Sequence, residues 1–230
     1  MINLWKTKKD FGFILIDKET GPTSHDIIYK LRKITEIKKI GHAGTLDPFA
    51  SGLMIVAIDR RATKEIEKFV KLDKKYLADI ILGKETNTHD RDGKIMSNYY
   101  GEKIPKQKIK EAILKIKNQT KQIPPMYSAK KINGKKLYEL ARKNIKIERK
   151  PQSIKISYIK IKKYIWPKLR LEIHCSSGTY IRTITNDLGK DLGCGAYLEE
   201  LRRTAIGSYK IKKAKKISKI NRKNWKKYLF

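Results

Sequence analysis

Hydrophobic and polar residues follow two different periods along the chain, and each period predicts a different kind of element. Short apolar runs predict strands at residues 11–18, 53–58 and 74–82. The run at 53–58 is apolar at every position, which is typical of a strand buried on both faces. From residue 150 onward the stretches 153–161 and 168–176 alternate apolar and polar side chains, as half-buried antiparallel strands do.

Apolar side chains at helical spacing predict helices in five other places. The first follows a break at Gly21-Pro22, and we expect Ser24 to cap it. The others are predicted over 61–71, over 106–117 and from about Thr179 onward, with a short one at 137–143. The stretch 83–94 is predicted to be either a polar loop or a hairpin with Asp92-Gly93 as its turn, and an Asn-Gly pair at 133–134 predicts another turn. Strands and helices mix without a regular βαβ repeat, which favours an α+β fold with a largely antiparallel sheet flanked by helices.

Charge narrows the class of partner. The 230 residues include 55 Lys and Arg against 23 Asp and Glu, which gives a formal net charge of +32. Such an excess is easiest to explain by a polyanionic partner, and nucleic acid is the leading candidate. The alternative is a compositional habit of a chain rich in Lys and Ile. The stretch 209–230 has ten basic residues and no acid, so it is either a phosphate-binding arm or a solvated end.

Other classes of protein are disfavoured. Two cysteines without a C-x-x-C spacing and four scattered histidines predict neither a disulfide scaffold nor a metal site. The first ten residues lack the apolar core of a signal peptide, and no apolar run is long enough to span a membrane. We therefore expect a cytoplasmic protein without a metal or a membrane partner.

The glycine-rich stretch 41–52, GHAGTLDPFASG, contains an isolated carboxylate, Asp47. Pro48 keeps Asp47 out of the helical conformation, and Gly41, Gly44 and Gly52 permit close backbone approach around it. Asp followed by Pro is also an ordinary start of a type I turn. No Gly-Lys-Ser/Thr follows, so the glycines do not form a phosphate-binding P-loop. The local pattern leaves two interpretations open: a simple turn, or a carboxylate displayed on a rigid loop as a nucleophile or base.

Arg182 and two tyrosines are further candidates. Arg182 lies in the first turn of a predicted helix, where a cation opposes the helix dipole, so we expect an anion beside it: a phosphate or the Asp47 carboxylate. Tyr76 and Tyr180 lie close to basic residues, and such aromatic faces stack on unpaired bases. A surface arginine and core tyrosines are the alternatives.

Six stretches together carry a resemblance to a known family. GHAGTLDPFASGLM resembles the signature of the bacterial tRNA pseudouridine-55 synthases of the TruB type, whose pattern is close to G-H-x-G-T-L-D-P-x-A-[ST]-G. The other blocks are GFILIDKETGPTSHD, KKYLADIILGKETNTHDRDG, PPMYSAKKINGKKLYELAR, CSSGTYIRTITNDLGKDLG and LEELRRTAIG. The resemblance covers residues 11–209 in order, and it implies a pseudouridine synthase fold with a catalytic domain at 1–209 and a short basic tail at 210–230. Family members commonly continue into a PUA-type domain, which this sequence does not show. Ser177 and Asn87 stand where the family often has lysine and aspartate.

The resemblance also implies roles for single residues. Asp47 would be the catalytic aspartate and Arg182 its salt-bridge partner. Tyr76 would stack on the flipped uracil, and Tyr180 would pack against it and serve as the base for its C5 proton. His42 would support the RNA loop that the target base leaves. Three more residues fall at family positions in the active site or near the RNA: Lys18, Leu201 and Asp90.

The implied reaction converts uridine to pseudouridine in the T-loop of tRNA. The N1–C1′ bond breaks, the uracil turns over and C5 bonds to C1′, so no cofactor or metal is expected. Asp47 could attack ribose C1′ or uracil C6, or act as a base at C2′. We expect a monomer that needs no protein partner. The alternatives are a synthase that depends on a guide RNA, and a non-catalytic RNA-binding or tRNA-folding protein.

Overall fold

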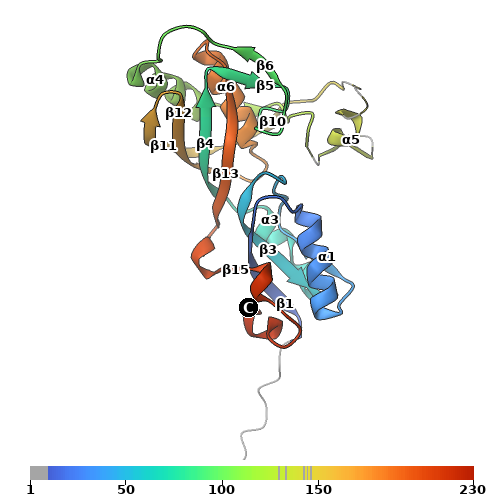
Figure 1. Cartoon of the computed structure of the whole chain (residues 1–230). Coiled ribbons are helices and arrows are strands. Elements are labelled where there is room, and N and C mark those ends of the chain that lie inside the picture. Colours follow the sequence, from blue (N-terminus) through green and yellow to red (C-terminus); the bar gives the residue numbers. More distant parts are fainter. Residues whose placement is uncertain (1–9, 129, 133, 142, 144, 146) are drawn as a thin grey trace, which may run out of the picture. The chain divides into compact units, whose positions relative to one another are not determined.

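The computed structural model describes residues 10–230 except 129, 133, 142, 144 and 146, and these residues form two compact units. The first unit consists of the chain up to Leu72 together with Arg203–Phe230, and the second is Asp73–Arg202 (Figure 1). Strand β13 (Ala196–Ile206) contributes residues to both. The predicted boundary at residue 209 separates a catalytic domain from a basic tail, and it stays a prediction.

The first unit is built around two long antiparallel strands. β1 (Gly12–Lys18) pairs with β3 (Ser51–Ile58), so that Lys18 lies opposite Gly52. β2 (Ile40–His42) also pairs with β3, and β15 (Lys215–Lys216) pairs with β1 in parallel. The predicted strands at 11–18 and 53–58 are confirmed, and β3 is buried along nearly its whole length, as expected from its apolar composition.

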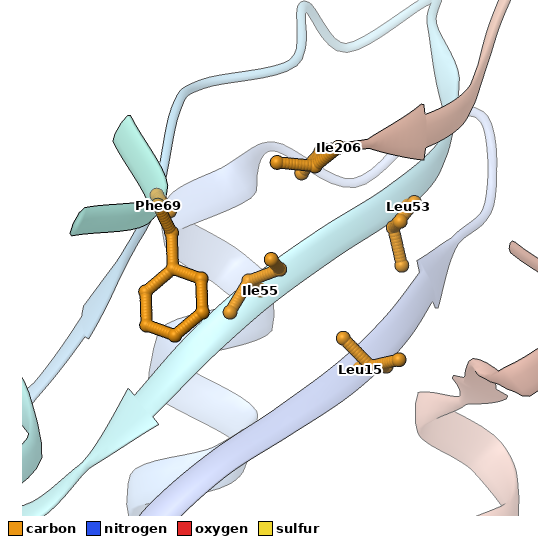
Figure 2. Packing of buried hydrophobic residues seen from close by; sticks show 6 residues of the cluster. Leu15, Leu53, Ile55, Phe69 and Ile206 are labelled. Atoms are coloured by element: carbon orange, nitrogen blue, oxygen red, sulfur yellow. The ribbon is translucent and has the colours of Figure 1, made fainter. Parts of the chain in front are cut away.

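Side chains that alternate along β1 and β3 fill the core of this unit. Leu15, Leu53 and Ile55 pack on one face with Phe69 and Ile206 (Figure 2). Phe69 comes from α3 (Glu67–Val70), which follows α2 (Asp59–Lys64). Sequence periodicity predicted one helix over 61–71, but tight hydrogen bonds between residues three apart, from Glu65 and Ile66 back to Ala62 and Thr63, separate two short helices.

Helix α1 (Ser24–Thr35) begins at Ser24, one residue earlier than a Ser24 cap would place it. Thr23 is the cap: its hydroxyl accepts from the Asp26 amide, and the Asp26 carboxylate accepts from the Thr23 amide in return. The predicted cap at Ser24 is therefore wrong. Because Thr23 satisfies the first turn, the Ser24 hydroxyl is left to bond elsewhere in the unit.

The basic C-terminal stretch packs against β1. It contains the short strands β14 (Tyr209–Lys210) and β15 and three short 3₁₀ helices (Ile211–Lys213, Ile217–Lys219, Trp225–Tyr228). At its end the backbones of Phe13 and Phe230 exchange hydrogen bonds of 3.2 and 3.0 Å, and their rings lie 5.9 Å apart. This stretch covers an edge of the sheet, where unpaired strands are a liability. A role in binding phosphate stays a prediction.

In the second unit, neighbouring strands of the main sheet follow the order β11-β12-β4-β13. Here β11 is Ile156–Ile165, β12 is Lys168–Cys175 and β4 is Lys74–Leu82, and the β11–β12 and β12–β4 pairs are antiparallel. The side chains of Leu169, Leu171, Ile173 and Cys175 are buried, as their alternation predicted. Helices α4 (Lys106–Lys117) and α6 (Ile181–Asp191) pack against each other beside this sheet. The structure confirms the α+β class with a mixed, mostly antiparallel sheet.

Smaller elements complete the second unit. The predicted hairpin is formed by β5 (Lys84–Thr86) and β6 (Ile95–Asn98). β7 (Lys121–Gln122) pairs with β10 (Gln152–Ser153), and β8 (Lys131–Ile132) with β9 (Lys135–Lys136). The predicted short helix is α5 (Leu137–Ala141). Asn133 of the predicted Asn-Gly turn lies outside the described residues.

Candidate active site

Asp47 lies at the start of a tight turn in the first unit. The Ala50 amide donates to the Asp47 carbonyl over 3.1 Å, with Pro48 and Phe49 between them. Leu46, Phe49 and Ala50 are buried and hold the turn to the unit, whereas Asp47 is partly exposed. The predicted Asp-Pro turn is therefore present, and it displays a carboxylate between buried neighbours.

Backbone groups on both sides of Asp47 are held by the segment after β1. The Ser24 hydroxyl donates to the Leu46 carbonyl over 3.0 Å and accepts from the Leu46 amide over 2.9 Å. The Gly21 amide donates to the Pro48 carbonyl over 2.9 Å. Each bond joins residues far apart in sequence, so the position of Asp47 depends on the tertiary structure and not on the turn alone.

Lys18 is fully buried beneath the turn. Its ammonium donates to the carbonyls of Ala50 at 2.7 Å, Glu19 at 3.0 Å and Pro48 at 3.3 Å. Burial lowers the pKa of Lys18 from 10.5 to about 8; the negative charge of Asp47 acts in the opposite direction, and the positive charge of Arg203 lowers it further. A lysine that the resemblance placed at the active site thus binds two carbonyls, those of Pro48 and Ala50, in the turn that carries Asp47.

Arg203, at the last part of β13, is a second buried cation in this region, with 2% of its surface exposed. Its guanidinium donates to the carbonyls of Leu53 at 2.7 Å, Gly44 at 3.1 Å and Thr45 at 3.4 Å. Arg203 was not among the residues expected at the site, because no strand was predicted where β13 lies. Its place in the block LEELRRTAIG was the available signal: an arginine among alternating apolar residues is expected on a strand.

Gly52 explains how Arg203 comes so close to the loop. Gly52 has a φ of +114°, and a Cβ added there would lie 2.3 Å from the Arg203 carbonyl oxygen and 2.5 Å from its amide nitrogen. The expectation that Gly52 permits close backbone approach is confirmed.

His42 ends β2 and precedes the loop. Burial lowers the pKa of His42 below 6.5, and the nearby charge of Arg203 lowers it further. The ring is therefore neutral near pH 7. Among the described residues its buried Nδ1 has no hydrogen-bond partner.

In the second unit, Arg182 is buried in the first turn of α6. It donates to the carbonyls of Tyr127 at 2.6 Å and Thr88 at 3.2 Å, and lies 3.3 Å from the Asp90 carboxylate. The expectation of an anion beside Arg182 is met within this unit by Asp90. The expected pairing with Asp47 joins residues of different units and stays a prediction.

Asp90 is fixed from several sides. Its carboxylate accepts from the Thr88 hydroxyl at 2.6 Å and the Asp92 amide at 3.2 Å, and Asp90 forms an isolated bridge with Leu198 of β13. Leu201 is buried on the same strand. The neighbouring His89 has a φ of +63°, and burial followed by the charge of Arg182 lowers its pKa to about 4.

The two tyrosines occupy well-defined backbone positions. Tyr76 is buried on β4, opposite Ile173 of β12. Tyr180 precedes α6, where its amide donates to the Gln122 side-chain oxygen over 2.8 Å and its carbonyl accepts from the Gln122 side-chain nitrogen over 3.0 Å. Gln122, buried on β7, was not predicted as a functional residue; it orients the backbone at Tyr180.

No cluster of three or more His, Cys, Asp or Glu side chains suited to a metal ion occurs among the described residues. Within the same part of the chain, none of the helices has the length and apolar character needed to cross a bilayer.

Comparison with known proteins identifies the class that this fold and these residues define. Residues 32–181 match the sequence model of the TruB family pseudouridylate synthase N-terminal domain. Residues 182–229 match that of the tRNA pseudouridylate synthase B C-terminal domain. The chain therefore belongs to the TruB family of pseudouridylate synthases.

Individual relatives agree with this assignment. A protein of Chlamydia abortus named tRNA pseudouridine synthase B is 51% identical over 201 residues, which are 87% of this chain and 84% of that protein. One of Endomicrobium trichonymphae with the same name is 46% identical, over 88% of each chain. Among solved structures, a chain in the crystal structure of a Cbf5-Nop10-Gar1 complex matches with a TM-score of 0.71 at 28% identity, covering 91% of this chain and 53% of that one.

Proposed function

We propose that this protein isomerises uridine 55 in the T-loop of tRNA to pseudouridine, with Asp47 as the catalytic group. The observation that carries the proposal is the turn at Asp47: a partly exposed carboxylate whose flanking carbonyls are bound by the buried Lys18 and Arg203. Relatives of 45–51% identity that carry the name tRNA pseudouridine synthase B support the substrate.

The chemistry needs one positioned carboxylate. The N1–C1′ bond breaks and C5 bonds to C1′; C5 then loses its proton and N1 takes one up, so the composition of the RNA is unchanged. Asp47 either attacks ribose C1′ or uracil C6 as a nucleophile, or takes a proton from C2′ as a base. None of these routes calls for a redox cofactor or a metal ion.

The other residues assist around the detached uracil. Tyr76 stacks on the base, Tyr180 packs against it and accepts the C5 proton, and Arg182 pairs with Asp47 as the RNA binds. The target base must leave its stack, at a cost of a few kcal/mol, and His42 supports the RNA loop that the base leaves. Asp90 lies near the bound RNA and pairs with Arg182. Lys18 holds the turn of Asp47, and Leu201 lines the site.

Binding of the RNA rests on charge. A net charge of +32 favours a long phosphate backbone, with counterion release as the driving force and a strong dependence on salt. We further propose that the protein works as a monomer in the cytoplasm and needs no guide RNA.

The test uses unmodified tRNA transcript labelled with tritium at uridine C5, without metal, cofactor or guide RNA. Wild-type protein is expected to release tritium, and Asp47→Asn to release none while it binds the tRNA equally well. Asp59→Asn is the matched control, because it removes one negative charge from the same unit at a partly exposed site paired with Arg61. A transcript with cytidine at position 55 is expected to release no tritium.

Two results would refute the proposal. Tight binding without release by the wild-type protein would favour an RNA-binding protein, or a synthase that requires a guide RNA. Release from the transcript that lacks uridine 55 would refute the assigned position while leaving the reaction class intact.

A further inference from the structure

We propose that Arg203 is a positioning residue for the catalytic aspartate: its guanidinium fixes the loop that carries Asp47, and the rate of isomerisation depends on it. This inference rests on the proposed role of Asp47. It concerns the first unit alone, since the arginine, the loop and its neighbouring strand all belong to it.

The contacts of Arg203 lie on both sides of Asp47 along the chain. Nη2 and Nη1 donate to the carbonyls of Gly44 and Thr45, before the aspartate, and Nε donates to the carbonyl of Leu53, after it. One planar group thus joins the two ends of the loop. Because the guanidinium geometry is rigid, the spacing between these ends is fixed.

The backbone of Arg203 is fixed as well. It lies so close to Gly52 that an added Cβ would approach the Arg203 carbonyl oxygen to 2.3 Å. Both the backbone of Arg203 and the position of its guanidinium group are therefore fixed. Lys18 binds the Pro48 and Ala50 carbonyls, so that four carbonyl groups of the segment 44–50 bind buried cations.

A buried charge is a costly way to fill this space. Withdrawing the guanidinium from water carries a penalty that its hydrogen bonds must offset, and buried ion pairs can often be replaced by apolar side chains without loss of stability. An apolar side chain would fill the same space but could not bind three carbonyls. The positive charge and the separately placed N–H donors of the guanidinium are needed if the loop must keep one conformation. A carboxylate that reacts at a defined atom has that requirement.

The first test compares Arg203→Lys with Arg222→Lys. Lysine keeps the positive charge at position 203, but all its donors lie on one nitrogen, which cannot occupy the three separate positions from which Nε, Nη1 and Nη2 reach the carbonyls of Leu53, Thr45 and Gly44. Arg222 is an exposed residue of the same unit that pairs with Glu36 at 3.2 Å, and its replacement serves as the matched control. The measured quantities are the single-turnover rate constant at saturating protein, the tRNA dissociation constant and the melting temperature.

We expect the rate constant of Arg203→Lys to fall about 100-fold, the size of effect that a displacement of about 1 Å has in an active site. Its tRNA dissociation constant is expected to stay within about threefold of the wild-type value, and Arg222→Lys within about twofold in both quantities. If Arg203→Lys reacts at the wild-type rate, the proposal is wrong. It is also wrong if only the amplitude of the reaction falls, because that result would mean a loss of folded protein.

A second variant, Arg203→Met, keeps the proposal testable if Arg203→Lys does not fold. Methionine replaces the buried charge with an apolar side chain. Hydrogen exchange is expected to be at least about tenfold faster at the amides of residues 43–47, 49 and 50 than in the wild type, and unchanged in the centre of β3. Unchanged exchange at 43–50 would overturn the proposal.

Failure of the proposed function gives a different pattern. If wild-type protein releases no tritium, the catalytic role of Asp47 falls and this inference falls with it. If the wild type is active, Asp47→Asn is inactive and both Arg203 variants react at the wild-type rate, only the role of Arg203 is refuted.

Discussion

Gly52 and Gly21 form a matched pair that tests how closely the strands β3 and β13 approach. Both glycines have a positive φ, +114° and +105°. An alanine Cβ at Gly52 would lie 2.3 Å from a backbone oxygen of Arg203, whereas one at Gly21 would have no atom within 4 Å. Both substitutions introduce backbone strain, and only Gly52→Ala adds an overlap.

The two costs can be assigned separately. Strain from a non-glycine residue in a sparsely populated backbone region is about 1–3 kcal/mol, so Gly21→Ala is expected to lose about that amount. Forcing an extra carbon into a packed site costs about 1–3 kcal/mol more. The atoms that the new Cβ meets belong to the backbone and cannot rotate away, so we expect Gly52→Ala to lose about 2–6 kcal/mol in total. That loss is a large part of a typical domain stability of about 5–15 kcal/mol.

Urea unfolding measures the difference. Trp225 is buried in the first unit, so its fluorescence in a background with Trp5→Phe and Trp166→Phe reports on that unit. Gly52→Ala is expected to lower the free energy of unfolding by about 2 kcal/mol more than Gly21→Ala does. Equal losses for the two variants would refute the argument, because the overlap with Arg203 would then contribute nothing.

Three further predictions concern buried polar groups. Burial lowers the pKa of Lys18 from 10.5 to about 8, so between these pH values the unfolded chain holds more protons. The free energy of unfolding should therefore rise with pH through this window by up to about 3 kcal/mol. Urea titrations of Lys18→Met should lack this part of the rise, and identical slopes would contradict it. Asp90→Asn removes one partner of a buried ion pair and should cost about 3 kcal/mol, whereas Asp79→Asn at an exposed pair should cost less than about 1 kcal/mol in calorimetry; equal costs would show that burial does not matter. Ser24→Ala leaves the amide and carbonyl of Leu46 without their hydroxyl partner, so it should lower stability by about 1–3 kcal/mol and speed hydrogen exchange at that amide. Unchanged exchange would refute the anchoring role of the hydroxyl.

Elements whose pattern agrees with their surroundings could be predicted from the sequence. The spacing of Ile109, Ala112, Ile113 and Ile116 predicted α4 with the bounds that the structure has. The alternation along β12 and the apolar run of β3 also identified their elements. In each case neighbouring elements bury one face of the element, or both. Such burial requires only that the side chains be apolar, so the local pattern is sufficient to predict the element.

The missed and corrected elements share a different cause. β13 carries charged residues at several positions, and its irregular burial at Glu199 and Glu200 weakens the period of two. Ser24 resembles a cap in sequence, but Thr23 takes that position and leaves the serine to bind Leu46. These outcomes depend on which segments lie nearby, and a local window does not contain that information.

By itself, the sequence determined the class of fold, the excess of positive charge and the Asp-Pro turn, and its six blocks pointed to the family that the comparisons identify. Only the tertiary structure showed what holds the turn: Lys18 lies 32 residues from Ala50 in sequence, and Arg203 lies 159 residues from Gly44. Spacing predicts the direction of a side chain within its own element. The partner of a buried cation, however, is set by the packing of distant segments, because buried charges must find acceptors wherever the fold brings them.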